Sequence, residues 1–420
     1  MSEKSELREK QNMSKMDDAK KKLLKEIIKK LPGGARPEEV KEKFKDVLKD
    51  VTSEDIIKIE EELVKEGMPR EELQKLCNIH MAVFGEQLAG QELLLASGHP
   101  ISILIEEHRI MLERAEKLEE FIGIVEEACD SVYVGDIMTE LQSIAKDFQD
   151  SEKHYMREEN VVFPIAEKHG ITEPPAIMWM EHDEIREVKR KFTSLVDKWN
   201  AIAFEEFKKR LTETAKPLCS LLPSHFYKEN NTLFPAILEA TSIDEWIEAR
   251  KEFDEIGYCS FTPATATVQM ESGKARSQKD LQGEAELKFE NGSLSKEEVE
   301  GILDALPIDL SFVDKTDRVK YFNKAEKRIF VRTKSVIGRK VELCHPKKSV
   351  HVVTKIVEAF KSGKKDVAEF WITMGGRLVH IRYFAVRDQN KKYLGTLEVT
   401  QDLTDIRKIE GEKRLLDWRE

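Results

Sequence analysis

Six residues whose side chains can bind metal occur in two copies of one pattern. Each copy begins with Glu-His, continues after a gap with His-x-x-x-Glu, and ends with Phe-Pro. The copies are Glu107-His108, His154, Glu158 and Phe163-Pro164, then Glu181-His182, His225, Glu229 and Phe234-Pro235. The gaps between the two histidines are similar, at 46 and 43 residues. Such a repeat in a helical region predicts two helical hairpins related by a pseudo-twofold axis.

The spacing of His154 and Glu158, and of His225 and Glu229, allows each pair to act together. Residues four apart lie on one face of a helix, about 6 Å apart along its axis. Each pair can therefore direct an imidazole and a carboxylate into a bundle, while one histidine from each partner helix completes the set. Inward Glu/His pairs are how helical bundles hold di-iron and di-manganese centres. Mixed imidazole and carboxylate ligands suit iron or manganese, and zinc would also accept them.

A structural role for these residues is the alternative. A lone histidine on an apolar face is usually a hydrogen-bonded core residue, and His-x-x-x-Glu can be an exposed helical pair. Two matched sets of three are harder to explain in this way, because burying four histidines and two glutamates without metal would be costly. The pattern therefore favours a metal centre.

Residues 98–240 resemble the hemerythrin-like (HHE cation-binding) family. The segments that begin at Glu181-His182-Asp-Glu and at His225-Phe-Tyr-Lys-Glu229 are similar to the iron-centre repair branch of that family. The resemblance implies a four-helix bundle with an oxo-bridged, non-haem di-iron site, and therefore two irons per chain. Carried over by motif, the ligands would be His108, His154, Glu158, His182, His225 and Glu229.

Two positions complicate this assignment. Oxygen-carrying hemerythrins have a further histidine one turn after the third-helix ligand, where this sequence has Arg186. Simple oxygen storage is therefore disfavoured. His99 competes with His108 as the first-helix ligand, but nine residues of helix separate them by about 13.5 Å and place them on opposite faces. The repeat favours His108, because Glu107-His108 matches Glu181-His182.

The elements that would position the ligands are four long helices. Their approximate spans are Pro100–Val125, Val134–Lys168, Pro175–Trp199 and Phe204–Leu238. The breaks between them are short, which predicts an up-down-up-down bundle over residues 95–240.

Composition limits the classes of protein that remain. The 420 residues are 40% hydrophobic and 35% charged, with a net charge of -11, so a nucleic-acid-coating protein is disfavoured. No run of 18 apolar residues occurs, and the first thirty residues are charged throughout, which argues against membrane spans and a secretory signal. Five scattered cysteines form no disulfide framework and favour a reducing, cytoplasmic compartment.

Residues 19–90 are expected to form a small all-α module. The segment from Glu66-Gly-Met-Pro to His80 resembles an uncharacterised family, DUF438, that commonly precedes such bundles. Cys77 and His80 share one helical face and could be metal or redox ligands. Two ligands do not close a site, so a buried thiol beside a polar histidine is the preferred interpretation.

Residues 241–293 are interpreted as a linker, and residues 294–409 as an α+β domain with an antiparallel sheet. This last segment resembles a PAS sensor domain, through Leu306-Pro-Ile-Asp-Leu-Ser-Phe-Val-Asp, Val319-Lys-Tyr-Phe-Asn and Thr400-Gln-Asp-Leu-Thr-Asp. PAS domains bind small ligands or haem, or dimerise. Cys344, His345 and His351 are candidate haem ligands, although an ordinary loop leading into a helix is preferred.

The sequence as a whole predicts a cytoplasmic three-domain sensor. The di-iron bundle would respond to oxygen, nitric oxide, peroxide or redox state, and the PAS domain would transmit the change. No kinase motif, phosphate-binding loop or DNA-recognition element is present in the sequence. Output would pass through a PAS-mediated homodimer or an unidentified protein partner. The alternatives are a di-iron enzyme for iron-centre repair or nitric oxide or peroxide reduction, and a scaffold with a structural metal.

Overall fold

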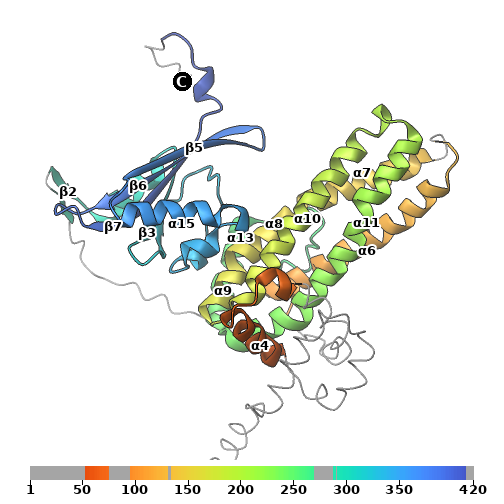
Figure 1. Ribbon diagram of the computed structural model, residues 1–420, viewed down its shortest axis with the longest axis horizontal. Helices are drawn as coiled ribbons and strands as arrows, with labels where there is room; N and C mark the ends of the chain where they lie inside the picture. The colour runs from red at the N-terminus through yellow and green to blue at the C-terminus, as the bar shows by residue number, and fades with distance from the viewer. Residues whose placement is uncertain (1–52, 75–94, 131–133, 269–286, 290, 413–420) are drawn as a thin grey trace, which may run out of the picture. The chain divides into compact units, whose positions relative to one another are not determined.

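The chain forms two units, residues 1–272 and 273–420, in a computed structural model that describes residues 53–74, 95–130, 134–268, 287–289 and 291–412. The first unit is helical, and the second contains a five-stranded antiparallel sheet (Figure 1). This confirms the predicted combination of a helical bundle with a C-terminal α+β domain. None of the described helices is long and apolar enough to cross a membrane.

The bundle has four helical arms, two of which are divided into successive segments. Its elements are α6 (Pro100–Glu127), α7 (Gly135–Asp150), α8 (Glu152–Arg157), α9 (Phe163–Lys168), α10 (Glu173–Asp197), α11 (Phe204–Lys228) and α12 (Phe234–Ala240). Single π-helical turns over Glu158–Val162 and Glu229–Leu233 join α8 to α9 and α11 to α12. A 3-10 turn, Trp199–Ala201, follows α10. These spans agree closely with the four helices expected from the sequence.

Each arm of the bundle packs against two others. Helix α6 contacts α7 and α11, and α10 contacts the same two helices. One apolar cluster includes Met111, Leu118 and Phe226, and a second includes Leu104 and Phe234. Since His108 follows Leu104 and precedes Met111 on α6, a polar layer lies between the two apolar clusters.

Local signals in the sequence explain where several helices begin and end. Pro100 occupies the first turn of α6, where its missing N–H costs no hydrogen bond. The Nδ1 atom of His99 accepts a hydrogen bond from the backbone N–H of Ile101 (3.2 Å) and caps that helix. Gly170, at φ +87°, follows α9 in the left-handed conformation that favours glycine.

The described part of the N-terminal region packs on the bundle through α4 (Ser53–Lys65). Ile57 of α4 joins the apolar cluster that contains Leu104. Arg70 makes two hydrogen bonds, of 2.6 and 2.9 Å, to the carboxylate of Glu173 at the start of α10. Residues 70–74 are also helical, and the rest of the all-α module expected over residues 19–90 lies outside the described residues.

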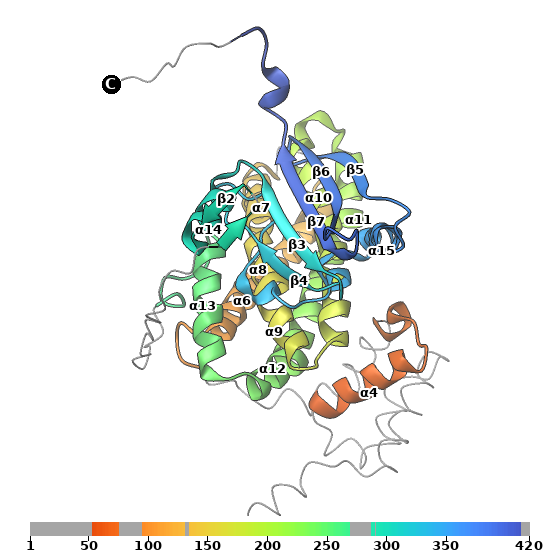
Figure 2. The same cartoon turned by 90° about the vertical axis from the view of Figure 1, so that its left-hand side faces the viewer.

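Residues 241–256 were assigned to the linker, and there the assignment was wrong. The structure has a helix, α13 (Ile243–Ile256), which runs beside α8 and α6 (Figure 2). Ser242 and Glu245 form a capping box at its start, and Trp246, Ala249 and Phe253 are buried. The apolar period of a helix is therefore present, but the polar residues between these positions obscured it.

The second unit begins with a hairpin, β1 (Leu287–Phe289) and β2 (Gly292–Leu294), and a short helix, α14 (Lys296–Ala305). The sheet has the order β4-β3-β7-β6-β5, with all neighbours antiparallel. Its strands are β3 (Asp309–Asp314), β4 (Val319–Phe322), β5 (Val367–Met374), β6 (Arg377–Arg387) and β7 (Tyr393–Asp402). Helix α15 (Lys347–Lys361) contacts β7, and Phe360 packs with the β6 residues Val379 and Ile381. Gly375 and Gly376 both have positive φ in the turn between β5 and β6, as the hairpin requires.

Candidate metal centre

The structure brings the six repeat residues together in the polar layer of the bundle. The inner histidines are His108 on α6, His154 on α8, His182 on α10 and His225 on α11; the inner glutamates are Glu158 and Glu229. All six side chains are buried. They form two groups of four candidate ligands, and both groups contain the two inner glutamates.

Each inner glutamate begins a π-helical turn, which the Phe-Pro pair of the repeat helps to explain. The N–H of Phe163 bonds to the carbonyl of Glu158, five residues earlier, and Phe234 bonds in the same way to Glu229. In a regular α-helix, the ring of Pro164 would clash with a carbonyl four residues earlier. The extra residue of the π turn relieves this conflict, and such turns are frequent at functional sites.

The imidazole Nε2 atoms face one another in two pairs. They are 3.1 Å apart between His108 and His154, and 3.0 Å apart between His182 and His225. Two ligand atoms at right angles on an ion with bonds of about 2.1 Å lie about 3.0 Å apart. The spacing within each pair is therefore that of neighbouring ligands on one metal ion.

Each inner glutamate has one oxygen near each histidine pair. Glu158 Oε1 lies 3.2 Å from Nε2 of His154, and Oε2 lies 3.3 Å from Nε2 of His182. Glu229 Oε1 lies 3.2 Å from Nε2 of His225, and Oε2 lies 3.3 Å from Nε2 of His108. Each of these carboxylates is thus shared between the two histidine pairs.

The outer nitrogen of every inner histidine has a hydrogen-bond acceptor. The Nδ1 pairs are His154 with Glu107 (2.7 Å), His225 with Glu181 (2.8 Å), His182 with Glu159 (2.8 Å) and His108 with Asn230 (3.0 Å). These partners hold the proton on Nδ1 and leave the Nε2 lone pair directed inward, the arrangement typical of metal-binding histidines.

The inner residues fit bound cations. No hydrogen-bond donor among the described residues reaches the four carboxylate oxygens of Glu158 and Glu229. Four imidazole lone pairs and four buried carboxylate oxygens would therefore face one another without donors. Positive charge in the layer is required, as metal ions or as protons on the histidines.

The pKa values of the inner histidines and of Glu158 are shifted in the directions that favour positive charge in the polar layer. Burial alone would lower the pKa of His182, but Glu158 and Glu159 raise it well above its usual value. The pKa values of the other three inner histidines are also raised, again against the effect of burial. Burial would raise the pKa of Glu158, but His154 and His108 hold it well below its usual value. The layer thus stabilises cations at its centre.

The partners of the outer nitrogens reproduce the pseudo-twofold repeat. Arg157 donates to both oxygens of Glu107 (2.7 Å each), and Lys228, three residues after the equivalent histidine, bonds to Glu181. Burial raises the pKa of Glu107, but His154 and Arg157 outweigh it and hold the value at about 2. Glu107 is therefore a carboxylate, as its contacts require.

The segment that follows α13 also reaches this outer layer. We call residues 257–268 the exit segment, because it leads towards the C-terminal unit. Its Thr262 hydroxyl donates to Glu107 Oε1 at 2.5 Å, and its buried Cys259 Sγ lies 3.7 Å from an Arg157 guanidinium nitrogen. Lys153 donates to the Tyr258 carbonyl at 2.8 Å. The exit segment is thus hydrogen-bonded to the side chain that orients His154.

Known families match the chain in three places. The model of the hemerythrin HHE cation-binding domain matches residues 99–252, within which all six residues of the cluster lie. Residues 99–252 are a hemerythrin HHE domain. A family of unknown function, DUF438, matches residues 24–90, and a PAS domain model matches residues 299–404. The predicted domain composition is therefore confirmed.

Solved structures similar to this chain include the C-terminal domain of a protein from Streptococcus mutans. It is 37% identical, covers 30% of this chain and 98% of its own, and has a TM-score of 0.29. A PAS domain from Colwellia psychrerythraea is 15% identical, covers 26% and 97%, and has a TM-score of 0.22. A sensory box sensor histidine kinase from Vibrio cholerae is 11% identical, covers 25% and 89%, and has a TM-score of 0.21. No curated protein matches the chain.

His99, the alternative first-helix ligand, lies away from the cluster of the HHE domain. Its ring packs against Trp246 at 4.8 Å between centroids, and its Nδ1 caps α6. Burial lowers its pKa to about 4. His99 therefore has a structural role at the end of the bundle.

Arg186, which replaces a histidine of oxygen-carrying hemerythrins, is held by two carboxylates. It donates to Glu152 (2.7–3.1 Å) and to Glu159 (2.8 and 3.1 Å). Burial alone would lower the pKa of Arg186, but these carboxylates raise it. Arg186 is thus a fixed cation behind the acceptor of His182, and it cannot donate electrons to a metal.

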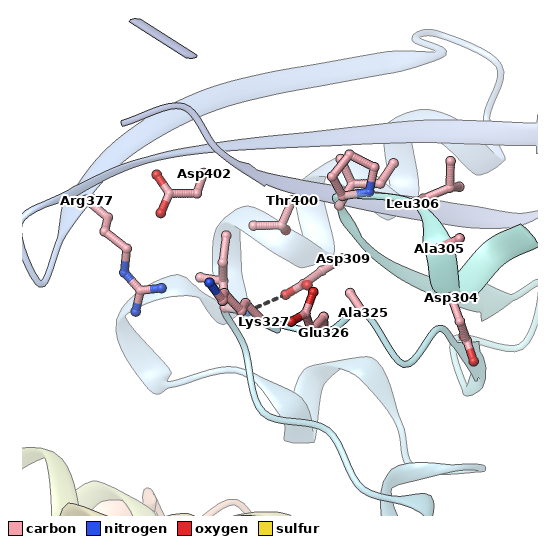
Figure 3. Close-up of a pocket in the computed structure, with 13 residues that line it drawn as sticks. Asp304, Ala305, Leu306, Asp309, Ala325, Glu326, Lys327, Arg377, Thr400 and Asp402 are labelled. Carbon is pink, nitrogen blue, oxygen red and sulfur yellow. Dashed lines mark hydrogen bonds between the residues drawn. The ribbon is translucent and has the colours of Figure 1, made fainter. Parts of the chain in front are cut away.

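The PAS domain contains a cavity of about 510 Å³ beside the start of β3 and the end of β7 (Figure 3). Its charged lining is Asp304, Asp309, Glu326, Lys327, Arg377 and Asp402. No histidine or cysteine lines this cavity, and His351 is exposed on α15. His345 is half-buried, and its Nδ1 bonds to the Val341 carbonyl at 2.8 Å. Haem binding by Cys344, His345 or His351 stays a prediction.

Several residues of the site were not assigned a role from the sequence. Glu107 and Glu181 were visible only as parts of the Glu-His pairs, and Glu159 and Asn230 only as neighbours of proposed ligands. Nothing in the sequence pointed to Thr262, which lies 155 residues from Glu107. Cys77 and His80, the candidate N-terminal ligands, lie outside the described residues.

Proposed function

We propose that this protein is a non-haem di-iron sensor that responds to oxygen, nitric oxide, peroxide or redox state and signals through its PAS domain. One observation carries the metal assignment. The carboxylates of Glu158 and Glu229 lie between two pairs of histidines whose Nε2 atoms face inward. Imidazole and carboxylate ligands suit iron or manganese, and a bundle with this inventory typically holds two such ions. Iron would supply the change of redox state, while the protein residues set its ligands and its surroundings.

The exit segment supports a sensor rather than a purely structural metal site. Glu107 accepts hydrogen bonds from both His154 and Thr262 of the exit segment, so a change of charge at the cluster would act on a carboxylate that also holds this segment. This is a continuous set of polar contacts from a proposed ligand to the chain that leads towards the PAS domain. Signalling needs such a difference in contacts between the two states.

The first test is metal content. Protein expressed in iron-replete cells and purified anaerobically should contain two irons per chain, and oxidation should produce a near-ultraviolet band from an oxo-bridged pair. One zinc per chain with no iron would refute the proposal.

A second test separates the sensor from an enzyme. Hydrogen exchange of the full chain should differ between ferric and ferrous protein in the exit segment and beyond it. Changes confined to residues 98–240, together with turnover of peroxide or nitric oxide, would instead support the alternative function, a di-iron enzyme. Arg186 favours both over oxygen storage, because it stands where oxygen carriers have a histidine.

A further inference from the structure

Tyr155 has a buried hydroxyl group without a hydrogen-bond partner among the described residues. Its side chain is fully buried on α8, directly after the inner histidine His154. An unsatisfied hydroxyl in a protein interior is unfavourable and uncommon. Such a group at a metal cluster suggests a partner that binds there.

The ring of Tyr155 lies against the inner histidines. Its centroid is 4.4 Å from that of His182, 5.4 Å from that of His154 and 6.5 Å from that of His225. The charges of Glu158 and Glu229 add to the effect of burial in raising the pKa of Tyr155 well above its usual value. The ring of Tyr155 therefore lies beside three of the four inner histidines.

The basic residues around Tyr155 contact its ring. Lys189 Nζ lies 4.2 Å from the ring centroid and donates to Ser151 Oγ at 2.6 Å. The guanidinium carbon of Arg186 lies 5.5 Å from the centroid, while its nitrogens bind carboxylates. Both side chains contact the ring, and neither bonds to its hydroxyl.

The repeat has phenylalanine at the equivalent position. Phe226 follows His225 as Tyr155 follows His154, and it stacks on His108 with 4.1 Å between centroids. One end of the cluster is therefore covered by an apolar ring and the other by a ring with a hydroxyl group. If the ring at this position served packing alone, phenylalanine would suffice in both copies of the repeat, and the hydroxyl group of Tyr155 would not be needed.

We propose that the hydroxyl of Tyr155 donates a hydrogen bond to a small exogenous ligand bound at the metal position of His182 and His225. The inference rests on the proposed di-metal function and identifies where its ligand binds. The ligand class is a small anion or diatomic molecule with an atom that accepts a hydrogen bond. Tyr155 would thus make the two metal positions unequal in their affinity for ligands.

The test is azide titration of the iron-loaded ferric full-length protein, followed through the azide-to-iron charge-transfer band. Tyr155→Phe should weaken azide binding about 10- to 100-fold, the loss expected for one hydrogen bond to a charged ligand. Its iron content should equal that of the parent, and its melting temperature should be unchanged or higher, because the hydroxyl has no partner to lose. Tyr227→Phe makes the same edit on a half-buried tyrosine of α11 and should leave azide affinity unchanged.

Three results would overturn the inference. Azide affinity within twofold of the parent would show that the phenol does not contact the ligand. Loss of iron or of thermal stability in Tyr155→Phe would show a structural role. A parent that binds no iron would refute the proposed function and this inference with it, whereas the first two results refute the inference alone.

Discussion

Thr262→Val tests whether the exit segment is coupled to the polar layer of the bundle. The substitution removes the hydroxyl that donates to Glu107 at 2.5 Å and preserves the shape of the side chain. Glu107 keeps Arg157 and His154 as partners, so no carboxylate is left without a donor. A hydrogen bond to a charged group contributes about 1.5–3 kcal/mol. In a domain of this size, its loss should lower the melting temperature of the bundle by about 3–12 °C.

Thr212→Val is the matched control. Thr212 also donates to a glutamate, Glu126, at 2.6 Å, but that bond is exposed and lies about five helical turns along α6 from His108. Exposed substitutions of this kind usually change stability by less than about 0.5 kcal/mol. Differential scanning calorimetry of both variants, iron-loaded, compares the two bonds directly.

Hydrogen exchange then tests the coupling itself. In Thr262→Val, residues 257–268 should exchange faster in both redox states, and the difference between ferric and ferrous protein in that segment should disappear. The argument fails if the redox difference survives in Thr262→Val, or if Thr212→Val removes it equally.

Four further outcomes are expected. His108→Ala should lose iron, whereas His99→Ala should keep its iron and lose about 1 kcal/mol with the α6 cap; metal analysis that gives the reverse would refute the ligand assignment. Metal-free protein should be most stable between the ordinary pKa values of the inner glutamates (4.5) and inner histidines (6.5). The raised histidine pKa values stabilise the fold below 6.5 and cease to do so as pH rises, while the lowered glutamate values stabilise it above 4.5 and cease to do so as pH falls. Iron binds neutral histidines, so the amount by which iron raises the melting temperature should be larger at pH 8 than at pH 5. An equal rise at both pH values would contradict this. Gly395→Ala should destabilise only the PAS unit, because the new Cβ would lie 2.2 Å from the Val313 carbonyl oxygen; calorimetry should show the HHE transition unchanged.

The sequence singled out six residues that the structure brings together, because they repeat. His-x-x-x-Glu places two ligands on one helical face wherever the helix lies, and the second copy supplies the partner hairpin. The π turns at Glu158 and Glu229 were not predicted, since the helical spacing alone does not show an added residue. Pro164 and Pro235 were the available signals, because proline inside a helical pattern requires a local change in hydrogen bonding.

The contacts around the inner residues could not be read from the sequence in the same way. Arg157 and Glu107 meet because two helices pack, and Thr262 reaches them only because α13 returns the chain alongside α8 and α6. Because residues 241–256 were assigned to a linker, the sequence analysis did not predict this contact. Helix α13, which the linker assignment missed, is therefore what brings the exit segment to the polar layer.

The differences between the two halves of the repeat follow from these outer contacts. The Nδ1 partner of His182 is the carboxylate of Glu159, whereas that of His108 is the neutral amide of Asn230. A carboxylate makes an imidazole a stronger electron donor than an amide does, so the His182 position should stabilise the higher charge on its metal. Arg186 offsets part of this effect, because it binds the same carboxylate. His108 and His182 hold the same place in the repeat, yet the proposed metal positions beside them would have different electrostatics. The side chains that create the difference are those that the repeat does not conserve.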